Sequence, residues 1–126
     1  AGAALNRIGD FNPQAMANTA WAFATAGVAA ETLFEAIAGA AANRVGDFNP
    51  QALANTVWAF ATAGVAAETL FEAIAGAAVN RIDDLNPQDM ANAVWAFATA
   101  GVAAETLFEA ITGAAVNRVG EFNPQN

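Results

Sequence analysis

Residues 48–84 read FNPQALANTVWAFATAGVAAETLFEAIAGAAVNRIDD, and the chain repeats this unit every 37 residues. Residues 11–47 and 85–121 are further copies, and the first copy differs from the middle one at only five positions. A fixed period of roughly 20–50 residues is typical of solenoids, in which each unit is one supersecondary element stacked on its neighbours. We therefore expect function on a surface repeated along the stack rather than in one pocket.

The chain ends do not coincide with unit boundaries. Residues 1–10 match the end of a unit, and residues 122–126 match the beginning of one. The expected organisation is a tail of a preceding repeat (1–10), three repeats (11–47, 48–84 and 85–121) and the start of a further repeat (122–126). The sequence thus reads as a window cut from a longer array.

The composition is acidic, with 12 Asp and Glu residues, 4 basic residues and a formal net charge of −8. All the basic residues are arginines. This balance opposes nucleic acids and anionic membranes, because both bind mainly through Lys and Arg. The absence of His and Cys disfavours a transition-metal site, and no cofactor is expected.

Each unit predicts two helices. Asn12 followed by Pro13 is typical of a helix start, and Gly27 is typical of a helix end. A second helix is expected from about residues 28–30, with Glu31 in its first turn and Arg44 in its last, where each charge complements the helix dipole. The fold class is therefore all-α, an α-solenoid of helix–turn–helix repeats with a 37-residue period.

Residues 11–30 are free of charge, but their Asn, Pro, Gln and Thr content favours a buried solenoid helix over a membrane span, so no membrane insertion is expected. Helical spacing places Trp21 on an apolar stripe with Ala17 and Ala24, which predicts that it and its equivalents Trp58 and Trp95 belong to the core. Gly39 in the middle of the second helix suggests a tight helix crossing.

Asparagines recur every 37 residues in the first helix and should align as a ladder. Such a row can read base edges or bind an extended peptide, or each Asn can bond to the adjacent repeat. Positions beside the ladder vary between units and are the candidates for specificity. The ligand-facing candidates are Asn18, Asn55 and Asn92, with the flanking sets Ala15, Ala52, Asp89 and Thr19, Thr56, Ala93.

The charged residues give no catalytic constellation. Glu31 and Glu35 lie one helical turn apart on an expected solvated face, without a Lys or His to tune them. Arg44 is expected to neutralise a helix C-terminus, to pair with an acid such as Asp47, or to contact phosphate. The candidate phosphate contacts are Arg44, Arg81 and Arg118.

The stretches NPQALANTVWAFATAG and AAETLFEAIAGAA resemble the octotricopeptide and heptatricopeptide repeats. The pattern Leu/Met-Ala-Asn-x-x-Trp-Ala-Phe-Ala carries the resemblance at Met16–Ala24, Leu53–Ala61 and Met90–Ala98. The resemblance implies a right-handed α-solenoid that binds single-stranded RNA in an organelle, a mitochondrion or plastid. It also implies that the inner first-helix positions, Asn18 and Thr19 with their equivalents, face that RNA.

Two functional hypotheses follow, and both are non-enzymatic. One is an organellar RNA-binding segment, and the other is a structural or protein–protein interaction scaffold in a larger assembly. The acidic charge and the near-identity of the units depart from the basic, varied groove expected of an RNA reader. A row of arginines facing phosphate would favour RNA, whereas an exposed apolar or acidic inner face would favour the scaffold.

Overall fold

The computed structural model describes residues 11–27, 30–65, 67–102 and 104–117. These residues form α-helices joined by turns, two of which contain a short 3-10 helix, so the all-α expectation is confirmed. The elements are α2 (Pro13–Thr25), α3 (Glu31–Ala42), η2 (Val45–Asp47), α4 (Pro50–Ala63), α5 (Glu68–Asn80), η3 (Ile82–Asp84), α6 (Pro87–Ala100) and α7 (Glu105–Asn117).

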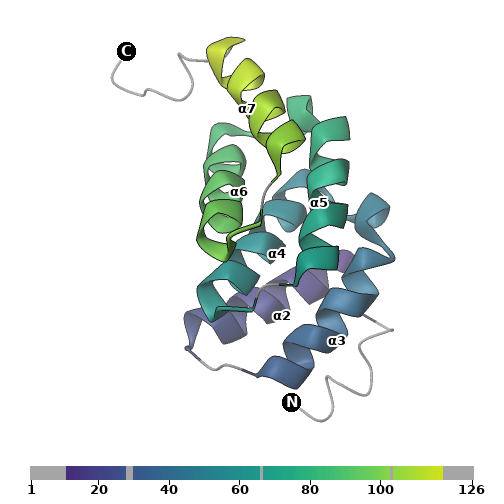
Figure 1. Ribbon diagram of the computed structural model, residues 1–126. Coiled ribbons are helices and arrows are strands. Elements are labelled where there is room, and N and C mark those ends of the chain that lie inside the picture. The colour runs from purple at the N-terminus through teal and green to yellow at the C-terminus, as the bar shows by residue number, and fades with distance from the viewer. Residues whose placement is uncertain (1–10, 28–29, 66, 103, 118–126) are drawn as a thin grey trace.

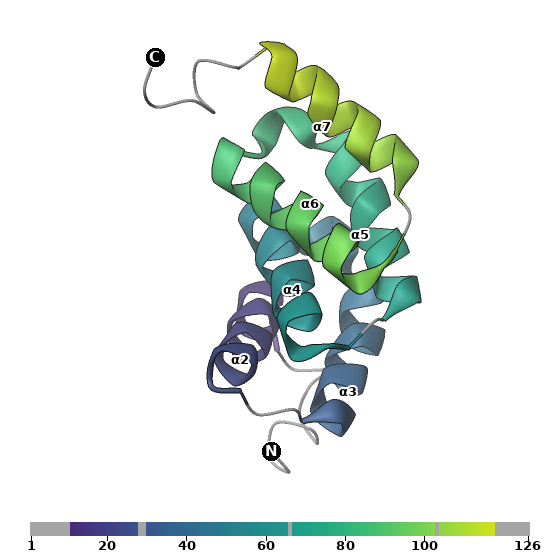
Figure 2. The same ribbon diagram turned by 60° about the vertical axis from the view of Figure 1, so that its left-hand side comes forward.

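The helices form two layers in a stack of hairpins (Figure 1). The first helices α2, α4 and α6 make one layer, and the second helices α3, α5 and α7 make the other (Figure 2). Within the first layer α4 packs extensively against both α2 and α6, whereas successive second helices contact each other far less. The first-helix layer is therefore the tighter of the two.

Local signals in the sequence begin and end each first helix. An asparagine N-cap accepts a hydrogen bond of 2.7 Å from the backbone N–H three residues later, and the proline that follows it opens the helix. The caps are Asn12, Asn49 and Asn86. Glycines in the left-handed region, with φ of 73–77°, follow the three first helices, as the sequence predicts.

Alanines line the contact between successive first helices. Ala17, Ala20 and Ala24 of α2 are buried against the next unit, and so are their equivalents in α4, which are Ala54, Val57 and Ala61. Small side chains allow helix axes to approach closely, toward the lower end of the usual 8–10 Å. This explains why the first-helix layer is tight.

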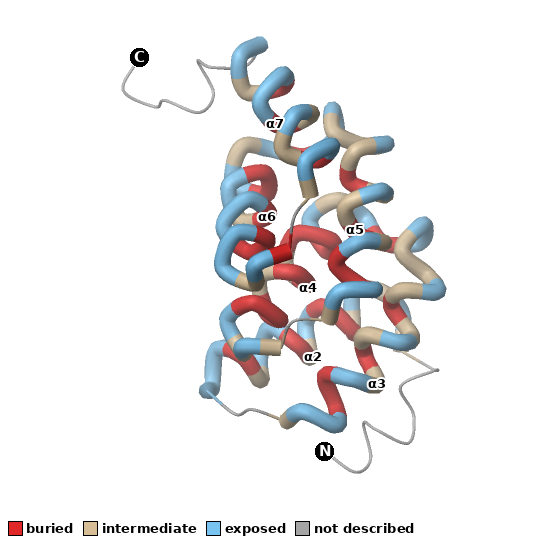
Figure 3. Tube along the Cα trace, viewed as in Figure 1, coloured by how far each residue is buried: buried red, intermediate tan, exposed pale blue. Residues whose placement is uncertain are grey.

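Phenylalanines join the two layers across the unit boundary. Phe34 of α3 meets Phe60 of α4 edge to face at 5.0 Å between ring centroids, and Phe71 of α5 meets Phe97 of α6 in the same way at 5.1 Å. All four rings are fully buried. The buried segments of the trace accordingly lie between the layers (Figure 3), and each unit completes the core of the next.

The prediction that the tryptophans belong to the core is wrong. Trp21 is 47% exposed, Trp95 is 46% exposed, and Trp58 is half-buried. The physical reason is the helical period, because Trp21 follows Asn18 by three residues and therefore shares its polar face. Its alanine neighbours in the predicted stripe turn instead into the contact between units.

The prediction of a tight crossing at Gly39 is also wrong. Gly39 is exposed, and a Cβ atom built on it would meet nothing within 4 Å; the same holds for Gly76 and Gly113. None of the described helices is long and apolar enough to cross a membrane.

Replacing Phe97 and Trp95 by alanine tests which aromatic stabilises the fold. We expect Phe97→Ala to lower the free energy of unfolding by about 3–5 kcal/mol, because it leaves a cavity in the core. Trp95→Ala should cost only about 1–2 kcal/mol, because nearly half of the ring is already in water. Urea unfolding of both variants measures the difference, and equal losses would contradict the assignment.

Candidate binding surface on the first helices

Each first helix exposes one polar stripe with intervals of four, three and four residues, which is the spacing of a single helix face. The stripe holds Gln, Asn, Trp and Thr in every unit, and its members are exposed or half-buried. We call these residues the first-helix surface. They are Gln14, Asn18, Trp21 and Thr25 on α2; Gln51, Asn55, Trp58 and Thr62 on α4; and Gln88, Asn92, Trp95 and Thr99 on α6.

The tryptophans form a ladder along this surface. The ring centroids of Trp21 and Trp58 are 6.3 Å apart with an angle of 29° between the rings, and those of Trp58 and Trp95 are 6.3 Å apart at 34°. Tilted, offset rings at this distance are a favourable arrangement for aromatic pairs. Trp58 has a neighbour on each side, which explains why it is the least exposed of the three.

The asparagine row lies beside the ladder. The side-chain amide of Gln14 donates to the Oδ1 of Asn18 at 3.1 Å, and Gln88 donates to Asn92 in the same way. Within the described ranges, none of the three asparagine side chains bonds to a neighbouring unit. The alternative in which each Asn joins adjacent repeats is therefore wrong, and the asparagine N–H groups remain available.

The flanking positions do not share this exposure. Ala52 and Thr56 of α4 are buried, and the Thr56 hydroxyl donates to the Ala52 carbonyl at 2.7 Å. Asp89 and Ala93 of α6 are buried as well. The expectation that these four face a ligand needs correction, because their flank of the helix packs against the preceding first helix. Their counterparts Ala15 and Thr19 on α2 are partly exposed.

Asp89 is the one buried carboxyl among the described residues. Its backbone N–H donates to the Asn86 cap. Burial raises the pKa of Asp89 above its ordinary value, because desolvation penalises the charged form, and a hydrogen bond with the backbone of Asn86 offsets part of this effect. The carboxylate is therefore part of the hydrogen-bonded N-terminus of α6 and is not exposed on the surface.

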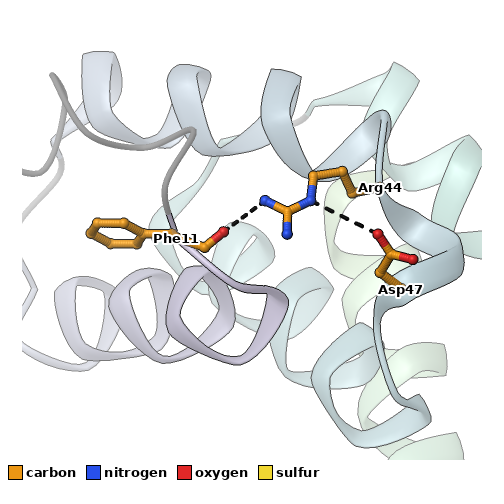
Figure 4. Close-up of polar contacts among 3 residues, drawn as sticks. All are labelled: Phe11, Arg44 and Asp47. Atoms are coloured by element: carbon orange, nitrogen blue, oxygen red, sulfur yellow. Dashed lines mark hydrogen bonds and ion pairs between the residues drawn. The ribbon is translucent and has the colours of Figure 1, made fainter.

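The arginines tie the two ends of each hairpin together. Arg44 follows the end of α3 instead of lying in its last turn, which corrects the sequence prediction. Its Nη1 donates to the Phe11 carbonyl at 2.6 Å, and its Nε lies 4.0 Å from Asp47 (Figure 4). Arg81 donates to the Phe48 carbonyl in the same way. The expected acid partner is thus present, whereas Arg118 lies outside the described residues.

Charge separates the two layers. No member of the first-helix surface is charged, whereas glutamates line the exposed sides of the second helices. These glutamates are Glu31, Glu35, Glu68, Glu72, Glu105 and Glu109. The 3-10 turns add exposed Asp47, Asp83 and Asp84. In the described part of the chain, no group of three or more acidic side chains gathers as a metal site would require.

These features define an α-helical repeat protein whose most regular exposed surface is an uncharged amide and indole grid. The family model of the RNA-editing substrate-binding complex 6 protein matches residues 3–126, and the chain belongs to this family. Comparison with curated proteins and with solved structures found no match. The helical-repeat character is confirmed, but the family shown is not specifically that of the octotricopeptide or heptatricopeptide repeats.

Replacing Arg81 by methionine tests the hairpin tie. The variant keeps the long stem and loses the donor to the Phe48 carbonyl, and we expect the free energy of unfolding to fall by about 1.5–3 kcal/mol, as for hydrogen bonds with a charged partner. The control is Gln51→Met, because Gln51 is exposed and has no described side-chain hydrogen bond. Equal unfolding curves for the two variants would show that the tie contributes nothing.

Replacing Asp89 by the alanine of the other units tests its burial. A raised pKa in the native state means that stability from this group is fullest below the unfolded pKa of about 3.9 and declines as pH rises through the native value. The difference in free energy of unfolding between Asp89→Ala and the parent chain should therefore favour the variant more near pH 7 than near pH 4. Thermal unfolding at both pH values measures this, with exposed Asp84→Ala as the control; a pH-independent difference would refute it.

Proposed function

We propose that this chain is a non-enzymatic assembly module of an RNA-editing substrate-binding complex, and that its first-helix surface holds an extended polypeptide of a partner protein. The family provides the setting, since its description names such a complex. The observation that carries the proposal is the regular, uncharged row of asparagines beside the tryptophan ladder. The following arguments support it.

The spacing of the indole rings suits an extended peptide. Equivalent indoles of neighbouring units are 6.3 Å apart, and an extended strand advances about 3.2–3.4 Å per residue, hence roughly 6.5 Å for two residues. A peptide running along the stack would therefore offer every second residue to each unit in the same orientation. The distance between neighbouring indoles therefore matches the two-residue repeat of an extended strand.

The chemistry of the two rows also suits a peptide. An asparagine amide offers both donors and an acceptor, and main-chain N–H and C=O groups need both kinds of partner. The indole edges provide apolar area for the side chains between those contacts. The described arginines contact backbone carbonyls at the hairpin ends, so the surface offers a ligand no cation. A neutral peptide main chain needs none.

A second candidate is single-stranded RNA, which the exposed tryptophans favour. Aromatic side chains form stacking platforms that accept any base. In this reading Asn18, Asn55 and Asn92 contact base edges, and Arg44, Arg81 and Arg118 contact phosphates. An organellar location belongs to this proposal. The net charge of −8 opposes it, because phosphate neutralisation supplies most of the affinity for nucleic acids.

Intrinsic fluorescence separates the two candidates, because all three tryptophans of the chain lie in the ladder. Clones selected from a displayed library of random peptides, and a pool of random single-stranded RNA, are titrated separately at low and physiological salt. We expect selected peptides to shift the emission of the parent chain. The affinity should fall at least about tenfold in Asn18→Ala, Asn55→Ala, Asn92→Ala, as a few lost hydrogen bonds imply.

The matched control is the triple variant Asn43→Ala, Asn80→Ala, Asn117→Ala, which removes exposed asparagines with the same period at the C-terminal ends of the second helices. Its peptide affinity should equal that of the parent chain. The proposal would be refuted if no peptide were selected. It would also be refuted if the selected peptides bound the triple variant of Asn18, Asn55 and Asn92 as tightly as the parent chain. RNA binding that weakens with salt and disappears on Arg44→Gln, Arg81→Gln, Arg118→Gln would establish the RNA candidate instead.

A further inference from the structure

The second helices carry a different repeated feature, a groove at each contact between them. The groove between α3 and α5 has a volume of about 210 Å³, and the groove between α5 and α7 has about 470 Å³. Both include the same positions one unit apart, in the C-terminal half of one second helix and at the start of the following second helix. Gly39, Ala42 and Leu70 line the first, and Gly76, Val79 and Leu107 line the second. We call them the second-helix grooves.

The unequal packing of the two layers explains the grooves. Alanines bring the first helices close together, whereas successive second helices contact each other far less. Gly39 and Gly76 leave the groove open, since a Cβ atom at either position would meet nothing within 4 Å. Glycine inside a helix costs about 1 kcal/mol relative to alanine, and no described contact requires it here.

The rims of the grooves are acidic. Glu72 and Glu105 line the larger groove, and Glu68 lines the smaller one. All three are exposed, and the described lining of the two grooves holds no Arg or Lys. An apolar floor below carboxylates presents a negative field to any approaching molecule. The matching surface has small apolar side chains flanked by positive charge.

We propose that the second-helix grooves dock a basic helical segment of a partner protein. Its small apolar side chains enter the grooves as ridges enter the space between helices, and its Lys or Arg residues pair with Glu72 and Glu105. The carboxylates repel the phosphates of RNA and of anionic lipids. A second copy of this chain carries the same net charge of −8 and is repelled as well. This docking surface is independent of the first-helix surface.

The probe is a fluorescein-labelled amphipathic helical peptide of Lys, Leu and Ala, compared with its counterpart that has Glu in place of Lys. Anisotropy titration should show binding of the Lys peptide that weakens with salt, and no binding of the Glu peptide. Glu72→Gln with Glu105→Gln should reduce both the affinity and its salt dependence. Asn18→Ala, Asn55→Ala, Asn92→Ala should leave this binding unchanged, which keeps the two proposals separable.

The decisive variant is Gly39→Leu with Gly76→Leu, which fills both grooves, favours the helix and keeps the net charge. We expect it to bind the Lys peptide at least about tenfold more weakly than the parent chain. Gly46→Leu is the matched control, because Gly46 lies in η2 outside the grooves and its Cβ direction is also open. Its affinity should not change.

If the groove-filled variant bound the Lys peptide as tightly as the parent chain does, the proposal would be overturned. The peptide would then be attracted only by the overall negative charge of the protein. Binding of both peptides would overturn it too. Sedimentation of the chain without peptide gives the remaining test. Self-association that the groove-filling substitutions abolish would assign the grooves to a second copy and not to a basic partner.

Discussion

The alanine-lined contact between successive first helices is the constraint on which the other features depend. It requires residues such as Ala17, Ala20 and Ala24 on one flank of each helix, and small partners on the opposite flank of the next. Close approach brings equivalent indoles to 6.3 Å and buries Ala52, Thr56, Asp89 and Ala93. The second helices contact each other far less, and grooves open between them.

The two layers consequently offer surfaces of different chemistry. One side is a neutral grid of Gln, Asn, Trp and Thr at a regular interval, and the other is a series of small apolar grooves below glutamates. The arginines, which would be the natural contacts for a polyanion, close the hairpins by donating to carbonyls at their starts. Separate neutral and acidic faces allow one array to offer two different binding surfaces.

Helical period predicted which residues share a face, whereas the apolar character of a residue did not predict whether that face is buried. It placed Asn18 on an exposed stripe correctly, and the same counting puts Trp21 on that stripe, three residues later. The core prediction for Trp21 followed its apolar character and its alanine neighbours instead. Those alanines turned out to serve the contact between units. In a repeat protein an apolar residue can face its own hairpin, the next unit or solvent, and spacing within one unit does not distinguish these three.

The secondary structure follows from local signals: the asparagine caps, the proline starts, the left-handed glycines and the 37-residue period give two helices per unit through local backbone chemistry. The flank of each helix that meets a neighbour is set by packing between units, because it depends on how closely two helices from different units approach. This approach buried Thr56 and Asp89, exposed the indoles and left Gly39 beside open space. Packing within one hairpin brings Arg44 to a carbonyl 33 residues earlier in the same unit, a contact that no local pattern specifies.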